Sequence, residues 1–188
     1  MTWTAANARA VAGSCLQESG DRWLHVQAVG GSAEDLRAWS SHVSEAVVMA
    51  AWLHDVGYAD SVAATGFHPV DGANWLEGLG VPPGVVALVA HHSGARFEAE
   101  ERGLGELLAR FPEPDPDQLD ALTLIDLSTS PIGRRISVQD RLAEILERYP
   151  DDDPVHRAVS RSCSYLEESA SRAAERLGLA DVRAGSVL

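Results

Sequence analysis

The sequence predicts an all-α protein, and three features indicate this class. Apolar residues recur mostly three or four positions apart, alanine is abundant, and valine and isoleucine rarely alternate with polar residues as they do in strands. The chain has 188 residues, which is enough for one domain with a hydrophobic core and not comfortably enough for two. We therefore expect a single domain over residues 1–188 that offers one cleft for a functional site.

Start and stop signals divide the chain into a series of predicted helices. They cover residues 5–17, 21–29, 44–56, 68–80, 83–93, 119–127 and 155–177. The first helix is expected to end before Gly20. Asp21 is a favourable N-cap for the second, and the pair Gly30-Gly31 is expected to end it. The third is the most apolar segment of the chain, and Gly57 is expected to close it.

Proline and glycine define the later helices. Pro69 and Pro83 suit the first turn of a helix, and Gly80 and Gly94 stand where these two helices are expected to stop. A proline-interrupted acidic loop after Phe111 precedes the next helix, and a second acidic loop precedes the last one.

Charge and composition exclude several functions. Fifteen basic residues against 28 acidic ones give a net charge of −13, so the chain lacks the electrostatic footprint of a protein that binds a nucleic-acid polymer or an anionic membrane. All 15 basic residues are arginine, which excludes lysine-dependent P-loops and Schiff bases. Cys15 and Cys163 form no metal or redox motif. With no secretory signal and no membrane-length apolar stretch, we expect a cytoplasmic protein.

Side chains that can bind metals fall within or at the ends of five different predicted helices. They are His25, the pair His54-Asp55, His68, the pair His91-His92, and Asp126. Their spacing matches no local metal loop, so a site would have to be assembled by tertiary contacts, as helix bundles do. Imidazole nitrogens and carboxylate oxygens without thiolate suit iron, manganese, zinc, nickel or cobalt.

Asp126 is the strongest single indication of such a site. Leu124, Ile125 and Leu127 surround it, and an unpaired buried carboxylate costs several kcal/mol. His25 or His68 taken alone is more often a core side chain than a ligand. The prediction of a metal site therefore depends on all of these residues occurring together.

These residues resemble the signature of the HD-domain superfamily of metal-dependent phosphohydrolases, which is a His, an adjacent His-Asp pair and a distant Asp. The matching segments are RWLH, AAWLHDVGY and TLIDLSTSP. The additional segments FHPVDGA and VAHHSGA make the pattern similar to the dinuclear branch that includes bacterial symmetrical diadenosine-tetraphosphate hydrolases. The resemblance covers about residues 20–130 and implies an HD-domain helical bundle with a central metal cleft, followed by C-terminal helices over 138–178.

The resemblance implies a site for two divalent transition-metal ions, chosen from Fe, Mn, Ni, Co and Zn. The implied ligands are His25, His54, Asp55, His68, His91 and Asp126. Asp55 would belong to both ions and act as the catalytic bridge, with His68 and His91 completing the second. A pair of ions that share a water would hydrolyse a small, nucleotide-like phosphoester or phosphoanhydride.

Four further residues have expected roles at this site. His92 would donate a proton to the leaving oxygen. Arg22, Arg96 and Arg134 lie nearest in sequence to the implied ligands and are the candidates for binding substrate phosphates.

Two alternatives remain open. The first is an oxygenase, since some HD-superfamily proteins with the same ligand pattern use a mixed-valence di-iron pair to activate oxygen. The second is a protein that is no enzyme, namely a metal-binding sensor or interaction module without turnover. Tyr58 stands where many relatives have lysine. The Gly-Tyr-Pro motif of the cyclic-di-GMP branch is missing, which disfavours that substrate.

Overall fold

The computed structural model describes residues 2–179, and this part of the chain is all-α, as predicted. Its elements are α1 (Ala5–Leu16), α2 (Asp21–Trp39), α3 (Glu45–Leu53), the 3-10 turn η1 (Val56–Tyr58), α4 (His68–Gly78), α5 (Pro83–His91), the 3-10 turn η2 (His92–Gly94), α6 (Ala95–Arg102), α7 (Gly105–Leu108), α8 (Pro116–Leu127), α9 (Val138–Arg148) and α10 (Pro154–Arg176). Residues 2–179 contain no strand, and Thr129 and Arg135 form an isolated bridge.

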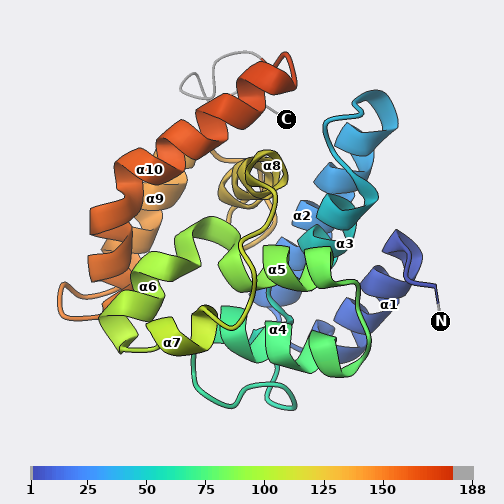
Figure 1. Ribbon diagram of the computed structural model, residues 1–188. Helices are drawn as coiled ribbons and strands as arrows, with labels where there is room; N and C mark the ends of the chain where they lie inside the picture. The colour runs from blue at the N-terminus through green and yellow to red at the C-terminus, as the bar shows by residue number, and fades with distance from the viewer. Residues whose placement is uncertain (1, 180–188) are drawn as a thin grey trace.

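Two helices occupy the middle of the bundle. Every residue of α3 from 47 to 53 is buried, because α3 packs against α1, α2, α5 and α8. Figure 1 shows α8 almost end-on, with α9 and α10 on one side and α2 and α3 on the other. A helix that is covered on all sides needs apolar residues all round, which explains why α3 is the most apolar segment.

Helix α2 corrects one prediction, because it does not end at Gly30-Gly31 but runs on to Trp39. Gly30 is required by a close helix contact. A Cβ atom at this position would lie 2.8 Å from Cε3 of Trp52 on α3 and closer still to other atoms of that ring. The glycine that looked like a helix stop therefore allows α2 and α3 to approach each other.

Helices α6 and α7 are missing from the sequence prediction. Only Ala95 and Ala99 are buried on α6, and most of its other residues are charged, so the apolar periodicity is weak. The helix begins directly after Ser93 and Gly94, which both have positive φ values, 47° and 75°. This turn lets the chain change direction between α5 and α6.

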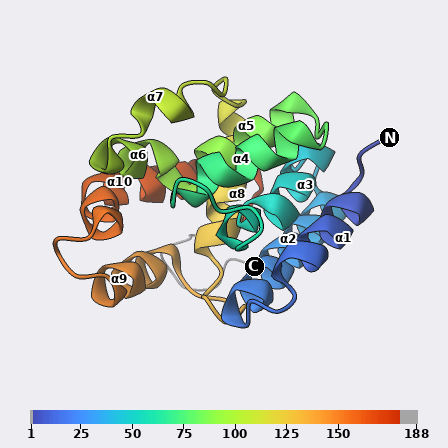
Figure 2. The same cartoon turned by 90° about the horizontal axis from the view of Figure 1, so that it is seen from below.

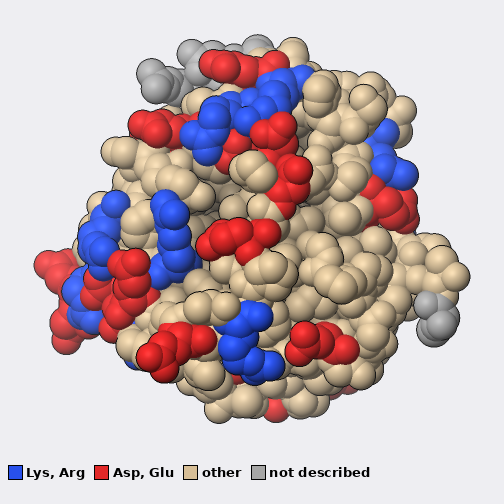
Figure 3. Space-filling model, in the orientation of Figure 1, with Lys and Arg blue, Asp and Glu red and all other residues tan. Residues whose placement is uncertain are grey.

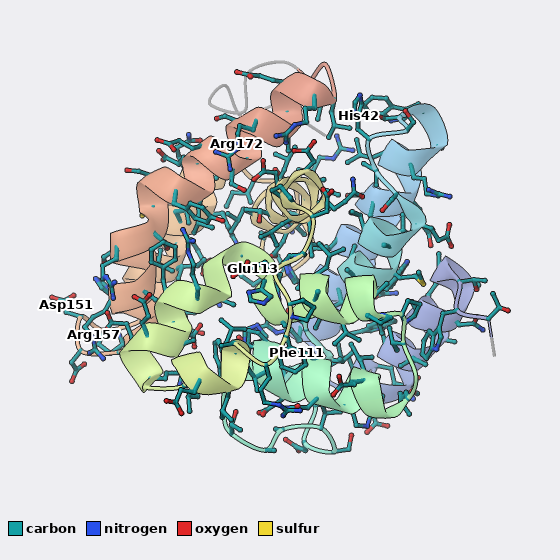
Figure 4. All side chains as sticks on the ribbon, in the orientation of Figure 1. His42, Phe111, Glu113, Asp151, Arg157 and Arg172 are labelled. Atoms are coloured by element: carbon teal, nitrogen blue, oxygen red, sulfur yellow. The ribbon has the colours of Figure 1, made fainter. Side chains whose placement is uncertain are left out.

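Asp120 ties α8 to α10 through a buried carboxylate. It accepts hydrogen bonds from Ser169 Oγ at 2.6 Å, Arg172 Nε at 2.8 Å and Arg176 Nη1 at 2.9 Å. Figure 4 shows Arg172 on α10 beside α8. These bonds hold α10 against the helix that carries Asp126.

On the face in Figure 3, acidic and arginine side chains lie next to one another. Ion pairs between such side chains include that of Arg161 with Glu100. Among residues 2–179, no helix is both long enough and apolar enough to span a membrane.

Candidate metal centre

The structure brings six side chains together where five segments of the chain meet. They are His25 on α2, His54 and Asp55 directly after α3, His68 at the start of α4, His92 directly after α5, and Asp126 in the last turn of α8. One group consists of His25, His54 and Asp126, and the other of Asp55, His68 and His92. Within each group, one potential ligand atom from each residue lies within 4.8 Å of the others.

Asp55 lies between the two groups. Its Oδ2 is 3.3 Å from Nε2 of His54, and its Oδ1 is 3.5 Å from Nε2 of His68. Arg22 Nη1 also donates a hydrogen bond to Oδ2 at 2.5 Å. The two carboxylate oxygens therefore face different groups, which is the placement that a bridging ligand requires.

Three of the four histidines are held in the same tautomer by the backbone. Nδ1 of His25 donates to the carbonyl oxygen of Ser130 at 3.1 Å, Nδ1 of His54 to that of Ala51 at 2.9 Å, and Nδ1 of His92 to that of Val89 at 2.6 Å. Because carbonyl oxygens only accept, these bonds fix the proton on Nδ1 and leave Nε2 to face the cluster. Metal-binding histidines characteristically make this second hydrogen bond.

The Nε2 atoms of the cluster histidines converge on one another. His25 Nε2 is 3.3 Å from His54 Nε2, and His68 Nε2 is 3.2 Å from His92 Nε2. Two nitrogen lone pairs at such a distance repel each other unless a proton or a cation lies between them. The donor set of buried imidazoles and carboxylates thus fits transition-metal ions, and the six residues form a buried His/Asp cluster that is compatible with an HD-type site.

The electrostatics of the cluster keep its two carboxylates anionic and two of its imidazoles neutral. Burial by itself would raise the pKa of Asp55, but Arg22 and His54 outweigh it and hold that pKa well below its usual range. Burial lowers the pKa of His68 and of His92, which keeps both rings neutral. Burial also disfavours the His54 cation, but the nearby carboxylates raise the pKa of His54 to about 9.

The structure places His91 and His92 differently from the sequence prediction. His91 is turned away from the cluster, and its Nε2 donates to the carbonyl oxygen of Phe111 at 3.2 Å. Its Nδ1 lies 3.8 Å from Glu113. Figure 4 shows Phe111 and Glu113 on the segment between α7 and α8. His92, which is 4% exposed, takes the place in the second group that the sequence assigned to His91, so we do not assign it the proton-donor role.

The side chains of His91 and His92 point to different partners, His91 to the carbonyl oxygen of Phe111 and His92 to the cluster. The helix α5 ends at His91, and His92 is already in a different backbone conformation, with ψ of 151°. A double His therefore gives no indication from sequence of which ring faces inward.

Ser93 is a site residue that sequence reasoning missed. Its hydroxyl donates a short hydrogen bond to Oδ2 of Asp126. Ser93 is also the only non-glycine residue among 2–179 with positive φ, at 47°. A backbone strained in this way costs on the order of 1 kcal/mol and often marks a functional site. The Ser-Gly pair after two histidines resembles an ordinary helix end, so no sequence signal identified it.

A cleft opens beside the cluster, with a cavity of about 110 Å3. Arg22 lines it, and its guanidinium stacks 4.0 Å from the ring centre of Tyr58. Arg96 and Arg134 do not line it, so the structure places neither of these two predicted arginines at the cleft. Arg96 is exposed and stacks on Tyr165, and Arg134 is exposed on the loop before α9.

Two further arginines line the cleft besides Arg22, namely Arg141 and Arg148, both on α9. Sequence reasoning missed them because they lie 15 and 22 positions after Asp126 and belong to an ordinary amphipathic helix with a polar face. Only the fold of α9 against the cleft reveals their position.

The chain matches no protein-family model, and no curated protein or solved structure is significantly similar to it. The interpretation of the cluster therefore depends on the residues and on their geometry. Chemically, the arrangement offers two sets of nitrogen and oxygen ligands, a carboxylate shared between them, and a cationic arginine at the edge of an open cleft.

Proposed function

We propose that the protein is a metal-dependent hydrolase of a small phosphoester or phosphoanhydride. The observation that carries this proposal is the convergence of backbone-oriented Nε2 atoms and two buried carboxylates beside an open cleft. The resemblance to HD-type phosphohydrolases supports the same activity and favours a nucleotide-like substrate.

The six cluster residues would hold two divalent ions of Fe, Mn, Ni, Co or Zn. The group of His25, His54 and Asp126 would bind one, and the group of Asp55, His68 and His92 the other. Such ions lower the pKa of a water molecule and neutralise the charge that develops on phosphoryl oxygens.

The protein itself orients these ligands and the substrate. Arg22 fixes Oδ2 of Asp55 and, because it also lines the cleft, can present its other N–H groups to a phosphoryl oxygen. Ser93 fixes Oδ2 of Asp126, and this leaves Oδ1 directed at His25. Both contacts keep the carboxylates in place before the substrate binds, which reduces the reorganisation needed during the reaction.

The test is phosphate release from a panel of nucleotides and small phosphate esters, with the full chain loaded with Mn, Fe, Ni or Co. Asp55→Asn should remove the activity, because its oxygens serve both groups. Asp60→Asn is the matched control, because it changes an exposed carboxylate five residues away from Asp55, and this variant should retain the phosphate-releasing activity.

The same assay under anaerobic conditions distinguishes hydrolysis from oxygen-dependent chemistry. Steady phosphate release by the manganese-loaded protein without oxygen would support hydrolysis. Activity that survives Asp55→Asn, or oxygen consumption with no release of phosphate from any ester, would contradict the proposal.

A further inference from the structure

The wall of the cleft formed by α9 and α10 combines aliphatic side chains with positive charge. Leu142 and Ile145 of α9 and Val155, Val159 and Leu166 of α10 line it. Figure 2 shows α9 and α10 on the side of the bundle away from α1, α2 and α3. The organic part of a substrate whose phosphoryl group lies at the metal centre would therefore meet this wall.

Arg141 is the buried cation of this wall. The residue is 6% exposed and lines the cleft, and within residues 2–179 its Nε has no hydrogen-bond partner. Its Nη1 donates to Oε2 of Glu144. A buried guanidinium with an unused donor is rare in proteins, because buried polar groups are nearly always paired.

Glu144 does not neutralise the wall. It is shared between Arg141 and Arg148, both of which line the cleft, whereas Glu144 does not. Two guanidinium groups and one carboxylate leave one net positive charge on this wall, and of these three residues only the arginines line the cavity. Glu98 of α6 also lines the cleft, and its carboxylate is paired with Arg102. An anionic oxygen group on a ligand would satisfy both the charge and the unused donor.

We propose that Arg141 is a specificity-determining residue that binds a second anionic oxygen group on the organic part of the substrate. The inference rests on the proposed function and narrows its substrate class to small phosphate esters with a short aliphatic part and a further negative charge. The aliphatic lining fits such a chain, and no asparagine or glutamine is present on it to recognise the polar edge of a base. The second group is a carboxylate or another phosphate.

The experiment compares matched substrate pairs with the manganese-loaded full chain. Phosphoglycolate is paired with ethyl phosphate to test a carboxylate, and propane-1,3-diol bisphosphate with propyl phosphate to test a second phosphate. We expect kcat/KM to be at least tenfold higher for the doubly charged member of at least one pair. In Arg141→Gln, this ratio should fall at least fivefold, because the favoured member alone loses its partner.

Arg161→Gln is the control, since Arg161 is an exposed arginine on α10 that pairs with Glu100 and Glu101 outside the cleft. It should keep the wild-type ratio. If Arg141→Gln does not fold, Arg141→Lys decides the question, because lysine keeps the charge but cannot bind an anion in the planar, bidentate manner of arginine. In Arg141→Lys, the ratio of kcat/KM between the doubly charged and the singly charged substrate should fall at least threefold.

Equal kcat/KM values within both pairs for the wild type would overturn the proposal. An Arg141 variant that lowers kcat/KM for both members of a pair by the same factor would also overturn it, because such a result indicates a purely structural arginine. If the chain releases phosphate from no ester and from no nucleotide, the proposed function fails, and calorimetric binding of phosphonoacetate against methylphosphonate decides the inference separately. If the wild type binds phosphonoacetate more tightly than methylphosphonate and the Arg141 variant does not, the inference is supported. If the wild type binds both ligands equally, the inference is refuted.

Discussion

Gly57→Ala should both destabilise the protein and weaken the metal binding proposed for the His/Asp cluster. Gly57 lies two residues after Asp55, and a Cβ atom there would lie 2.8 Å from the amide nitrogen of Gly72 and closer still to the carbonyl oxygen of His68. Ordinary contact begins at 3.4 Å, and both neighbours are backbone atoms that no rotamer change can move. The turn η1 and helix α4 would therefore have to separate, which also separates Asp55 from His68.

Overpacking against backbone costs about 3 kcal/mol, at the upper end of the usual range. For a chain of this length, this corresponds to a melting temperature lowered by roughly 6–12 °C. Thermal unfolding of the metal-free protein measures the stability, and Mn2+ titration measures the effect on the site. Gly31→Ala is the control: its Cβ would meet no atom within 4 Å, and it should stabilise α2 by up to about 1 kcal/mol. A Gly57→Ala protein with unchanged melting temperature and Mn2+ affinity would refute the reasoning.

Two further predictions concern Ser93 and Asp120. Ser93→Ala and Ser93→Gly both lose the hydrogen bond to Asp126, but only glycine adopts the positive φ without strain. In urea unfolding, the glycine variant should therefore be more stable than the alanine variant by about 1 kcal/mol. Equal stabilities of the two variants would contradict a strained backbone at this position. Burial would raise the pKa of Asp120, but hydrogen bonds from Arg172, Ser169 and Arg176 lower it. The carboxylate therefore stabilises the fold fully above its unfolded-state pKa, near ~4, and this contribution is lost as the pH falls further. Asp120→Asn should lower the free energy of unfolding by about 1–3 kcal/mol at pH 7, and this difference from the wild type should become smaller below pH 4. A difference that does not change with pH would contradict a stabilising Asp120 carboxylate.

The fold class could be predicted from local patterns because the spacing of apolar residues along a helix is visible in the sequence. The apolar helix α3 and the proline-marked starts of α4 and α5 were predictable for this reason. The continuation of α2 past Gly30 was not, because the cause lies in the ring of Trp52, 22 residues away in sequence. Glycine has two opposite uses, as a helix stop and as a close-contact residue, and the sequence alone does not distinguish them.

The cluster could be predicted in composition but not in orientation. His25, His54, Asp55, His68 and Asp126 stood out because polar groups in apolar helices need a partner. The choice between His91 and His92 depends on where α5 ends, which is set by the turn through Ser93 and Gly94. The arginines of the cleft depend on how α9 packs, so nearness in sequence to a ligand was a poor guide to Arg96 and Arg134.

Titration of the chelator-stripped protein with Mn2+ tests the metal centre most directly, with His91→Gln and His92→Gln as a matched pair. The wild type should bind two ions per chain and melt at a higher temperature when they are bound. His91→Gln should keep both ions, because His91 faces Phe111, whereas His92→Gln should lose at least tenfold in affinity for one of them. A wild type that binds no Mn2+ would contradict the metal-binding role of the cluster. A loss of Mn2+ affinity in His91→Gln but not in His92→Gln would contradict it as well.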